Sequence, residues 1–379
     1  MRVLIAPDSF KESLSAAEAV GAMARGVDGA IAGVEIDLCP MADGGEGTVE
    51  ALVEATGGEY RVSRVSGPLG EVVEARWGVL GEKGGGDSGD MKTGVIEMAA
   101  AAGLMLVDEG KRDPAKTATY GVGELIRAAI DEGCTRIIVG IGGSATNDGG
   151  AGMAQALGVR FIGEGGEIES RVTGGDLIGL SAVDHTGMDH RLRGVEIWVA
   201  CDVTNPLAGE RGAAAVYGPQ KGADAAGVAA LDAGLKHFAG FMGDVDSDAP
   251  GMGAAGGLGF GLVAFCGAEL RRGVEIVLEA VGFEERVKRA DLVLTGEGKL
   301  DGQSIQGKTC MGVAQAAARA GVKAVALVGA AGEGADEMLA QGLSGYHTLM
   351  DVAGSKEEAM RDAAVLIERL AGDAVTRYM

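Results

Sequence analysis

A chain of 379 residues is long for a single hydrophobic core and has room for two α/β domains. It carries 33 basic and 55 acidic residues, a formal net charge of -22, and a field of that sign repels nucleic acids and anionic membrane surfaces. No apolar run approaches the ~18 residues of a membrane-spanning helix, and the N-terminal apolar run is too short for a secretion signal. We therefore expect a cytoplasmic protein without nucleic-acid or membrane partners.

Glycine is unusually abundant, with 68 residues against 7 prolines. Chains rich in Gly and poor in Pro usually contain many tight turns between strands and helices, and some of these turns bind anions through backbone N–H groups. The five cysteines are widely separated and include no C-x-x-C pair. We expect them to be reduced, mostly structural thiols.

In chain order, the apolar pattern predicts strands that alternate with helices. Strands are expected over residues 2–6, 34–38, 94–97, 136–140, 196–200, 291–295, 323–329 and 346–349. Helices are expected over residues 13–26, 48–56, 121–132, from about 149, and over 225–241, 258–278, 311–320 and 356–370. Short alternating runs around Gly67-Pro-Leu-Gly70 predict antiparallel hairpins between residues 60 and 80. Residues 81–90 predict a solvated, mobile loop.

The two ends of the chain share a regular β-α-β order, whereas the middle contains hairpins and long glycine-rich turns. We predict an α/β fold with a Rossmann-like parallel-sheet domain built from both termini, residues 1–60 and 286–379. A second α/β domain, residues 61–285, is inserted into it. Ligands of open parallel sheets bind beyond the carboxyl ends of the strands, so we expect the active site in the cleft between the two domains.

Five predicted strand ends carry polar or glycine-rich clusters. They are residues 7–11, 41–48, 140–150, 201–206 and 295–304. Any one of them is compatible with an ordinary turn and its caps. Together they combine carboxylates, lysines, hydroxyls and bare backbone, which predicts a site for a metal-bound polyphosphate.

These segments, together with Gly218-Pro-Gln-Lys-Gly-Ala223 and Gly253-Ala-Ala-Gly-Gly-Leu-Gly259, resemble the bacterial glycerate kinase family, of the type related to glycerate 2-kinases. The match covers essentially the whole chain. It departs at residues 308–312, where the family usually has a Pro-containing segment, and at a lengthened loop over 81–90. The resemblance implies an ATP- and Mg²⁺-dependent kinase that phosphorylates a hydroxyl of glycerate. We expect 2-phosphoglycerate rather than 3-phosphoglycerate as the product, and a monomer or homodimer.

Phosphoryl transfer needs positioning and charge neutralisation rather than covalent chemistry by the protein. Phosphate contacts are expected from Gly142, Gly143, Ser144, Thr146, Gly296 and Gly298, and metal ligands from Asp43, Glu46, Glu297 and Asp301. Positive charge for the phosphoryl group or the substrate carboxylate is expected from Lys11 and Lys308, and substrate contacts from Ser9 and Asn205. Roles as helix caps, turn residues or surface lysines are the alternatives.

Our candidate for the general base is Asp202. Residues 196–200 are apolar enough for a buried strand, and Asp202 lies just past its end, beside the poorly hydrating Cys201 and Val203. Partial loss of water raises the tendency of a carboxylate to accept a proton. A kinase base must take the proton of the acceptor hydroxyl, and a single Asp suffices. An Asp that merely caps the following turn is the alternative.

Two motifs point to other functions. Residues 302–309 fit the P-loop pattern G-x-x-x-x-G-K-T, but the predicted strand 291–295 ends several residues too early. Gly140-x-Gly142-x-x-Ala145 follows a predicted strand as a dinucleotide fingerprint does, although Asn147-Asp-Gly-Gly150 interrupts the expected helix. The rival functions are an NAD(P)-dependent oxidoreductase of a small hydroxy acid and a non-catalytic sensor of a nucleotide or organic acid.

Overall fold

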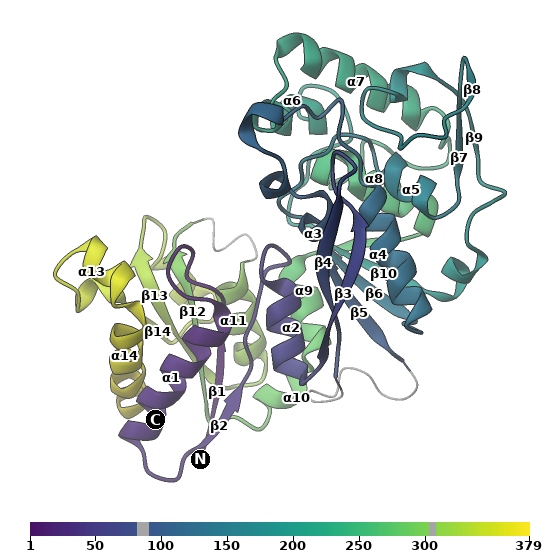
Figure 1. Ribbon diagram of the computed structural model, residues 1–379. Coiled ribbons are helices and arrows are strands. Elements are labelled where there is room, and N and C mark those ends of the chain that lie inside the picture. The colour runs from purple at the N-terminus through teal and green to yellow at the C-terminus, as the bar shows by residue number, and fades with distance from the viewer. Residues whose placement is uncertain (82–90, 303–307) are drawn as a thin grey trace.

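The computed structural model describes residues 1–81, 91–302 and 308–379. It is an α/β fold with two lobes, each built on its own large sheet (Figure 1). Residues 82–90 of the predicted loop and residues 303–307 in the middle of the P-loop pattern lie outside the described residues.

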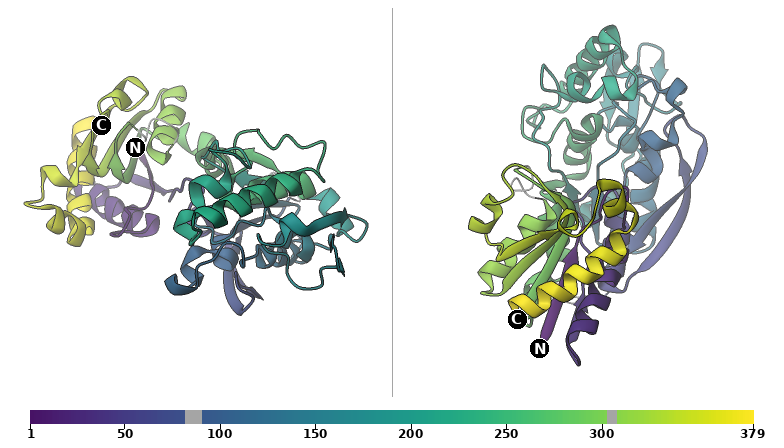
Figure 2. Two further views of the ribbon diagram at one scale, coloured as in Figure 1. Left: turned by 90° about the horizontal axis from the view of Figure 1, so that it is seen from above. Right: turned by 90° about the vertical axis from the view of Figure 1, so that its left-hand side faces the viewer.

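The first lobe is built on a five-stranded, fully parallel sheet in the order β14-β13-β12-β1-β2. Its strands are β1 (Arg2–Pro7), β2 (Glu35–Leu38), β12 (Leu292–Leu300), β13 (Lys323–Ala331) and β14 (Gly345–Thr348). β1 lies between β12 and β2 and pairs with β12, so that Val3 lies beside Leu292. Both termini lie on this lobe, as the two views of Figure 2 show. The predicted Rossmann-like sheet with strands from both ends of the chain is confirmed, while the domain limits at residues 60 and 286 stay a prediction.

Helices cover both faces of this sheet. On one face lie α1 (Ala16–Ala30), α14 (Ala363–Tyr378) and the short α13 (Lys356–Arg361), and on the other α11 (Thr309–Arg319) and α12 (Glu337–Ala340). Successive residues of β1 point to opposite faces, as in any strand, so Ile5 packs against α1 and α14 while Leu4 packs toward α11. Ser15 and Glu18 cap the start of α1 reciprocally.

The second lobe is built on a six-stranded mixed sheet in the order β11-β10-β6-β5-β4-β3. Its strands are β3 (Glu59–Ser66), β4 (Val72–Val79), β5 (Thr93–Glu97), β6 (Arg136–Gly140), β10 (Glu196–Ala200) and β11 (Glu269–Arg271). β3 and β4 form the predicted antiparallel hairpin, and the other four strands are parallel. A small antiparallel sheet of β7 (Arg160–Gly163), β8 (Gly166–Glu167) and β9 (Leu180–Asp184) lies at the edge of this lobe (Figure 1).

The helices of the second lobe correct one prediction. They are α3 (Ala99–Ala102), α4 (Tyr120–Asp131), α5 (Ala151–Ala156), α6 (Ala213–Tyr217), α7 (Ala225–Ala239) and α8 (Ala254–Cys266). The single helix expected over residues 258–278 is wrong. Gly267, at φ +63°, ends α8 with a left-handed cap, β11 then joins the sheet beside β10, and a separate helix α9 (Gly273–Ala280) follows.

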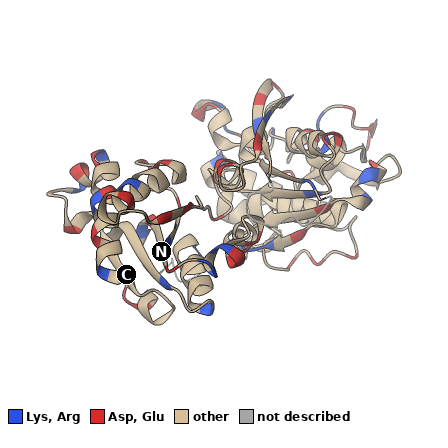
Figure 3. Cartoon of the chain, turned by 90° about the horizontal axis from the view of Figure 1, so that it is seen from below, with Lys and Arg blue, Asp and Glu red and all other residues tan. Residues whose placement is uncertain are grey.

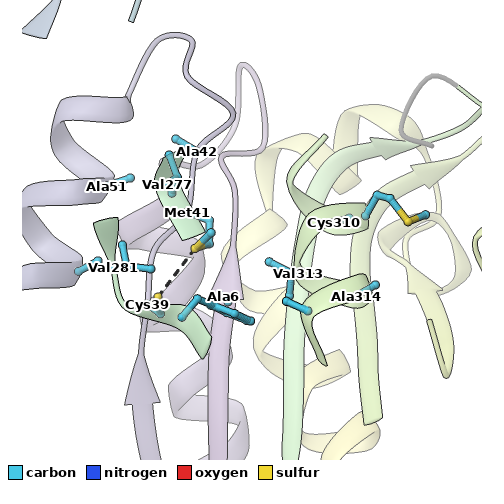
Figure 4. Close-up of a cluster of buried hydrophobic side chains, with 14 of the residues drawn as sticks. Ala6, Cys39, Met41, Ala42, Ala51, Val277, Val281, Cys310, Val313 and Ala314 are labelled. Atoms are coloured by element: carbon cyan, nitrogen blue, oxygen red, sulfur yellow. Dashed lines mark hydrogen bonds between the residues drawn. The ribbon is translucent and has the colours of Figure 1, made fainter. Parts of the chain in front are cut away.

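Three helices lie between the two sheets: α2 (Thr48–Thr56), α9 and α10 (Phe283–Val287) (Figure 1). They belong to one buried cluster that also contains Leu4 of β1, Val95 of β5 and Ile138 of β6. Figure 4 shows part of this cluster, where side chains from α2, α9 and the chain after β2 face one another. The two sheets therefore share a continuous apolar core. The five cysteines are free thiols, as expected.

Residues 41–47, which follow β2, pack closely against the second sheet. We call this segment the 41–47 loop. Gly44 has φ +90°, and a Cβ on it would lie 2.4 Å from the Cβ of Ala200 at the end of β10. A Cβ on Gly273, the first residue of α9, would lie 1.7 Å from the carbonyl oxygen of Asp43. Both positions require glycine, and the loop that carries Asp43 is thereby fixed at the carboxyl end of β10.

Charged residues occur on helices and loops of both lobes, with Lys and Arg scattered among Asp and Glu (Figure 3). Within the described ranges, no helix combines the length and the apolar character that crossing a bilayer requires.

Gly273→Ala is expected to lower the free energy of unfolding by about 1–3 kcal/mol, because the added methyl must displace the carbonyl of Asp43. The matched control is Gly29→Ala in α1, where a Cβ meets nothing within 4 Å. This control should leave stability unchanged or raise it by up to about 1 kcal/mol. Urea unfolding of both variants measures the difference, and equal effects would contradict the close approach described above.

Candidate active site

A cavity of about 470 Å³ opens where the 41–47 loop meets the carboxyl ends of β6 and β10. Five predicted site residues line it: Asp43, Gly142, Gly143, Ser144 and Asp202. Residues beyond the carboxyl ends of neighbouring parallel strands are where open α/β sheets bind ligands. The structure thus brings these five together from three segments of the chain that are far apart in sequence.

Asp202 lies two residues past the end of β10. Its Oδ1 accepts the backbone N–H of Gly273 at 3.0 Å, which orients the carboxylate. The surrounding protein removes enough water to raise the pKa of Asp202 to about 6, although part of the side chain remains exposed, and the charge of Asp43 adds to the increase. Such a group is mostly deprotonated at neutral pH and can still accept a proton.

Two further acids, Asp8 and Asp43, interact electrostatically in the same region. Asp8 follows β1; its Oδ1 accepts the N–H of Ser9 at 2.6 Å, and its Oδ2 accepts the hydroxyl of Thr309 at 2.5 Å. Burial, and then the charge of Asp43, raises the pKa of Asp8 to about 6. Asp43 therefore repels both Asp8 and Asp202, and we call these three acids the carboxylate row.

A buried lysine forms part of the cavity wall. Lys221, at the end of the 3-10 helix η5 (Pro219–Lys221), is 1% exposed. Its Nζ donates to the Oγ of Ser144 at 2.6 Å and to the backbone oxygen of Thr146 at 2.7 Å. Burial lowers the pKa of Lys221 to about 7, against the opposing effect of the Asp148 charge. An ammonium group has three donors, so one remains beyond these two bonds.

Other predicted residues gather at the carboxyl end of β1 and beside the neighbouring part of β12, where the strand order of the first sheet reverses. They are Ser9, Lys11, Gly296, Glu297, Gly298 and Lys308. The N–H of Asp8 donates to the oxygen of Gly296 at 2.8 Å, and Thr309 at the start of α11 bonds Asp8 from the other side. We call this group the switch-point group. Through Asp8 it adjoins the carboxylate row.

Strand β12 is longer than the sequence predicted. It pairs with β13 as far as Leu300, whereas we expected it to end at residue 295. Gly296 and Gly298 are therefore strand residues, and their contact with phosphate stays a prediction. The P-loop pattern at residues 302–309 therefore begins two residues after a strand, so the early strand end that we predicted before it is wrong.

Two predicted residues of the cavity region contact the protein rather than the cavity, although the buried hydroxyl of Thr146 has no hydrogen-bond partner. The amide of Asn205 accepts the hydroxyl of Tyr217 at 2.7 Å and donates to the backbone of Arg211 at 2.8 Å. Tyr217 lines the cavity, so Asn205 positions a wall residue. Thr146 is fully buried, and its backbone oxygen holds Lys221. Neither residue lines the cavity itself.

The predicted metal ligands are spread over several places. Glu46 is exposed, and the first turn of α2 is capped by Glu97, whose Oε1 accepts the N–H of Val49 at 2.8 Å. Asp301 forms an ion pair with Lys299 at 2.8 Å. Within residues 1–81, 91–302 and 308–379, no group of three or more His, Cys, Asp or Glu side chains is placed to hold a metal ion. The metal assignments stay predictions.

Asp8 and Lys221 were missed as single residues, although both lie in segments that the sequence had singled out. Asp8 directly follows the first predicted strand, a position that was itself a signal. Lys221 stands among Gly, Pro and Ala in residues 218–223, but only the tertiary structure reveals that it is buried.

Ala255 adds evidence for function at this cavity. It lines the cavity wall in the left-handed conformation, at φ +53° and ψ 42°, inside the kinked start of α8. This conformation costs a non-glycine residue about 1–2 kcal/mol. Such strain persists mainly at functional sites.

The fold and the cavity define an α/β enzyme with a ligand site at the carboxyl ends of parallel strands. Residues 3–379 match the model of the glycerate kinase family, and the chain belongs to that family. The family that the sequence motifs resemble is thereby confirmed.

Two relatives of known sequence and one solved structure are similar to this chain over nearly its whole length. The chain is 50% identical over 373 residues to a glycerate kinase of Halalkalibacterium halodurans, a match that covers 97% of this chain and 96% of the relative. It is 47% identical over 367 residues to the glycerate 2-kinase of Escherichia coli, covering 96% and 94%. A crystal structure from Salmonella typhimurium LT2, provisionally described as glycerate kinase 2, matches with a TM-score of 0.86 and 44% identity, covering 99% and 97%.

Replacing Lys221 tests its burial through the pH dependence of stability. In the folded protein Lys221 loses its proton near pH 7, whereas in the unfolded chain it does so only near ~10.4. The unfolded state therefore binds more protons in this range, and wild-type stability should rise relative to Lys221→Met as the pH increases from 7 to 10. The full difference is several kcal/mol, at roughly 1.4 kcal/mol per pKa unit. Parallel pH profiles in urea unfolding would show that the ammonium is not buried.

Proposed function

We propose that this protein is an ATP-dependent glycerate kinase that transfers the γ-phosphoryl group of ATP to the 2-hydroxyl of glycerate. Membership of the glycerate kinase family supports the reaction, and the name of the Escherichia coli relative supports the 2-hydroxyl. The observation that carries the proposal is Asp202, an oriented carboxylate with a raised pKa in the wall of a cavity at the end of β10.

Asp202 acts as the general base in this proposal. The acceptor oxygen of glycerate forms a bond to the γ-phosphorus, the bond from that phosphorus to the ADP oxygen breaks, and the hydroxyl proton passes to Asp202. Oδ1 is held by the N–H of Gly273, which leaves Oδ2 to take the proton. The role of Gly273 is to keep the carboxylate turned toward the cavity.

The carboxylate row fits a magnesium ion chemically. Mg²⁺ prefers oxygen ligands and commonly uses one or two carboxylates together with phosphate oxygens and water. After burial, repulsion by Asp43 contributes to the raised pKa values of Asp8 and Asp202, and a divalent cation would relieve this repulsion. We propose Asp43 and Asp8 as ligands, with Glu297 of the switch-point group as a further candidate. When bound, Mg²⁺ neutralises charge on the transferring phosphates.

We place the ATP phosphates between the switch-point group and the turn formed by Gly142 and Gly143. Lys11 and Lys308 would supply positive charge there against the net charge of -22. The dinucleotide alternative is weakened because α5 begins only at Ala151, so no helix directly follows the glycine turn. We also propose a cytoplasmic location, which suits five free thiols.

A coupled assay tests the reaction. The purified protein should consume ATP only when glycerate and a divalent cation are both present, and phosphorus NMR should identify 2-phosphoglycerate as the product. Reduction of NAD(P) by glycerate, or glycerate binding without turnover, would instead support one of the rival functions.

Asp202→Asn keeps the shape and the hydrogen bond of the side chain but removes the base. It should lower kcat by about 10²–10⁴ with little change in ATP affinity or Tm. Because the base works deprotonated, wild-type kcat/KM should fall as the pH decreases through about 6, and the variant should lose this part of the profile. A variant that melts early yet turns over normally would make Asp202 a structural residue.

A further inference from the structure

The acids in the cavity lining have the same sign of charge as the proposed substrate. Its described lining carries two acids, Asp43 and Asp202, and a single Lys or Arg, which is Lys221. Glycerate is itself an anion, and the chain as a whole is strongly acidic. An anionic substrate can approach the two acids only if a cation compensates for them, because like charges in a partly desolvated site repel strongly.

Lys221 is built to supply that cation in a fixed position. Two hydrogen bonds, to the Oγ of Ser144 and to the backbone of Thr146, hold its Nζ in the cavity wall. Pro219 begins the short helix that carries it. Little side-chain freedom remains to be lost when a ligand arrives, and such preorganisation favours binding.

The same geometry leaves two donors for a ligand. Lys221 uses two of its three N–H groups, and the third remains available at the cavity. Ser144 accepts a hydrogen bond from Lys221, so its own O–H is free to donate, and Ser144 also lines the cavity. Two neighbouring donors, one of them charged, suit the two oxygens of a carboxylate.

We propose that Lys221, with Ser144, binds the carboxylate of glycerate while Asp202 takes the proton of its hydroxyl. This inference rests on the proposed function and defines the substrate class of the cavity as short hydroxy acids. Lys221 and Ser144 hold the carboxylate of the substrate, and the hydroxyl of the substrate faces Asp202. A neutral polyol of the same size lacks the group that Lys221 requires.

Phosphate oxygens of ATP are the other anionic oxygens in this reaction. We favour the carboxylate because a single ammonium matches a single negative charge, whereas a polyphosphate normally meets a metal ion and several donors at once. Lys11 and Lys308 of the switch-point group are separate candidates for that task. The two sources are distinguished by titrating glycerate and ATP separately.

Binding through Lys221 should be coupled to proton uptake. The ionisable groups around its ammonium are Asp148 beneath it and Asp43, Cys201, Asp202 and Tyr217 in the cavity lining. Because burial leaves the pKa of Lys221 at about 7, the group is largely neutral at pH 8 in the free protein. An arriving carboxylate favours the charged form, so each glycerate should bring about one proton with it.

Isothermal titration with glycerate at pH 8, in two buffers of different ionisation enthalpy, measures both affinity and proton uptake. Wild type should take up close to one proton per glycerate. Lys221→Met should bind glycerate about 10- to 100-fold more weakly, without proton uptake, and should bind ATP as wild type does. Asp202→Asn should keep the proton uptake, which shows that Asp202 is not its source. Each titration is repeated with a non-hydrolysable ATP analogue present.

Three results would overturn the inference, in distinguishable ways. Wild-type glycerate affinity in a folded Lys221→Met leaves the kinase assignment intact and removes Lys221 from the substrate site. Loss of ATP binding alone assigns Lys221 to phosphate. Wild-type protein that binds no glycerate under either condition defeats the proposed function and this inference together. If Lys221→Met does not fold, Ser144→Ala replaces it: weaker glycerate binding with proton uptake retained supports the inference, and unchanged binding rejects it.

Discussion

The site depends on one close contact, between the 41–47 loop and the start of α9. The carbonyl of Asp43 lies where a side chain on Gly273 would be, and the N–H of Gly273 holds the carboxylate of Asp202. One glycine thus positions two acids that come from different parts of the chain. Because the helices around this contact belong to the core shared by both sheets, packing of the interior and geometry of the site cannot change independently.

The cavity combines acids with a buried lysine, in a chain whose net charge of -22 is strongly negative. Burial and the charge of Asp43 raise the pKa values of Asp8 and Asp202, and burial lowers the pKa of Lys221. Both arrangements cost stability in the free protein, and both costs fall when a cation or an anion of the right kind binds. Ionisable groups whose pKa values are strongly shifted in the free protein, and whose charges a ligand would compensate, are typical of functional sites.

Sequence reasoning succeeded where local pattern decides structure. Helix α2 and strands β6 and β10 have the predicted limits, and Asp202, chosen for its position just past a predicted strand, lies in the cavity lining. Sequence reasoning failed where pairing or packing with distant residues decides the structure. The length of β12 comes from pairing with β13, and the three residues of β11 are too few for a periodic signal. The burial of Lys221 is likewise a tertiary property, because residues 218–223 have no periodic apolar pattern that would indicate it.

The position of β1 in its sheet has a consequence for biosynthesis. β1 lies between β2 and β12, and its partner Leu292 emerges from the ribosome long after Val3. The six strands of the other sheet, by contrast, all lie between Glu59 and Arg271 and can pair while translation continues. The N-terminal strands must wait with one edge uncovered, a state in which chains aggregate readily. Chaperone demand should therefore centre on the first forty or so residues, because β1 gains its partner β12 only late in translation.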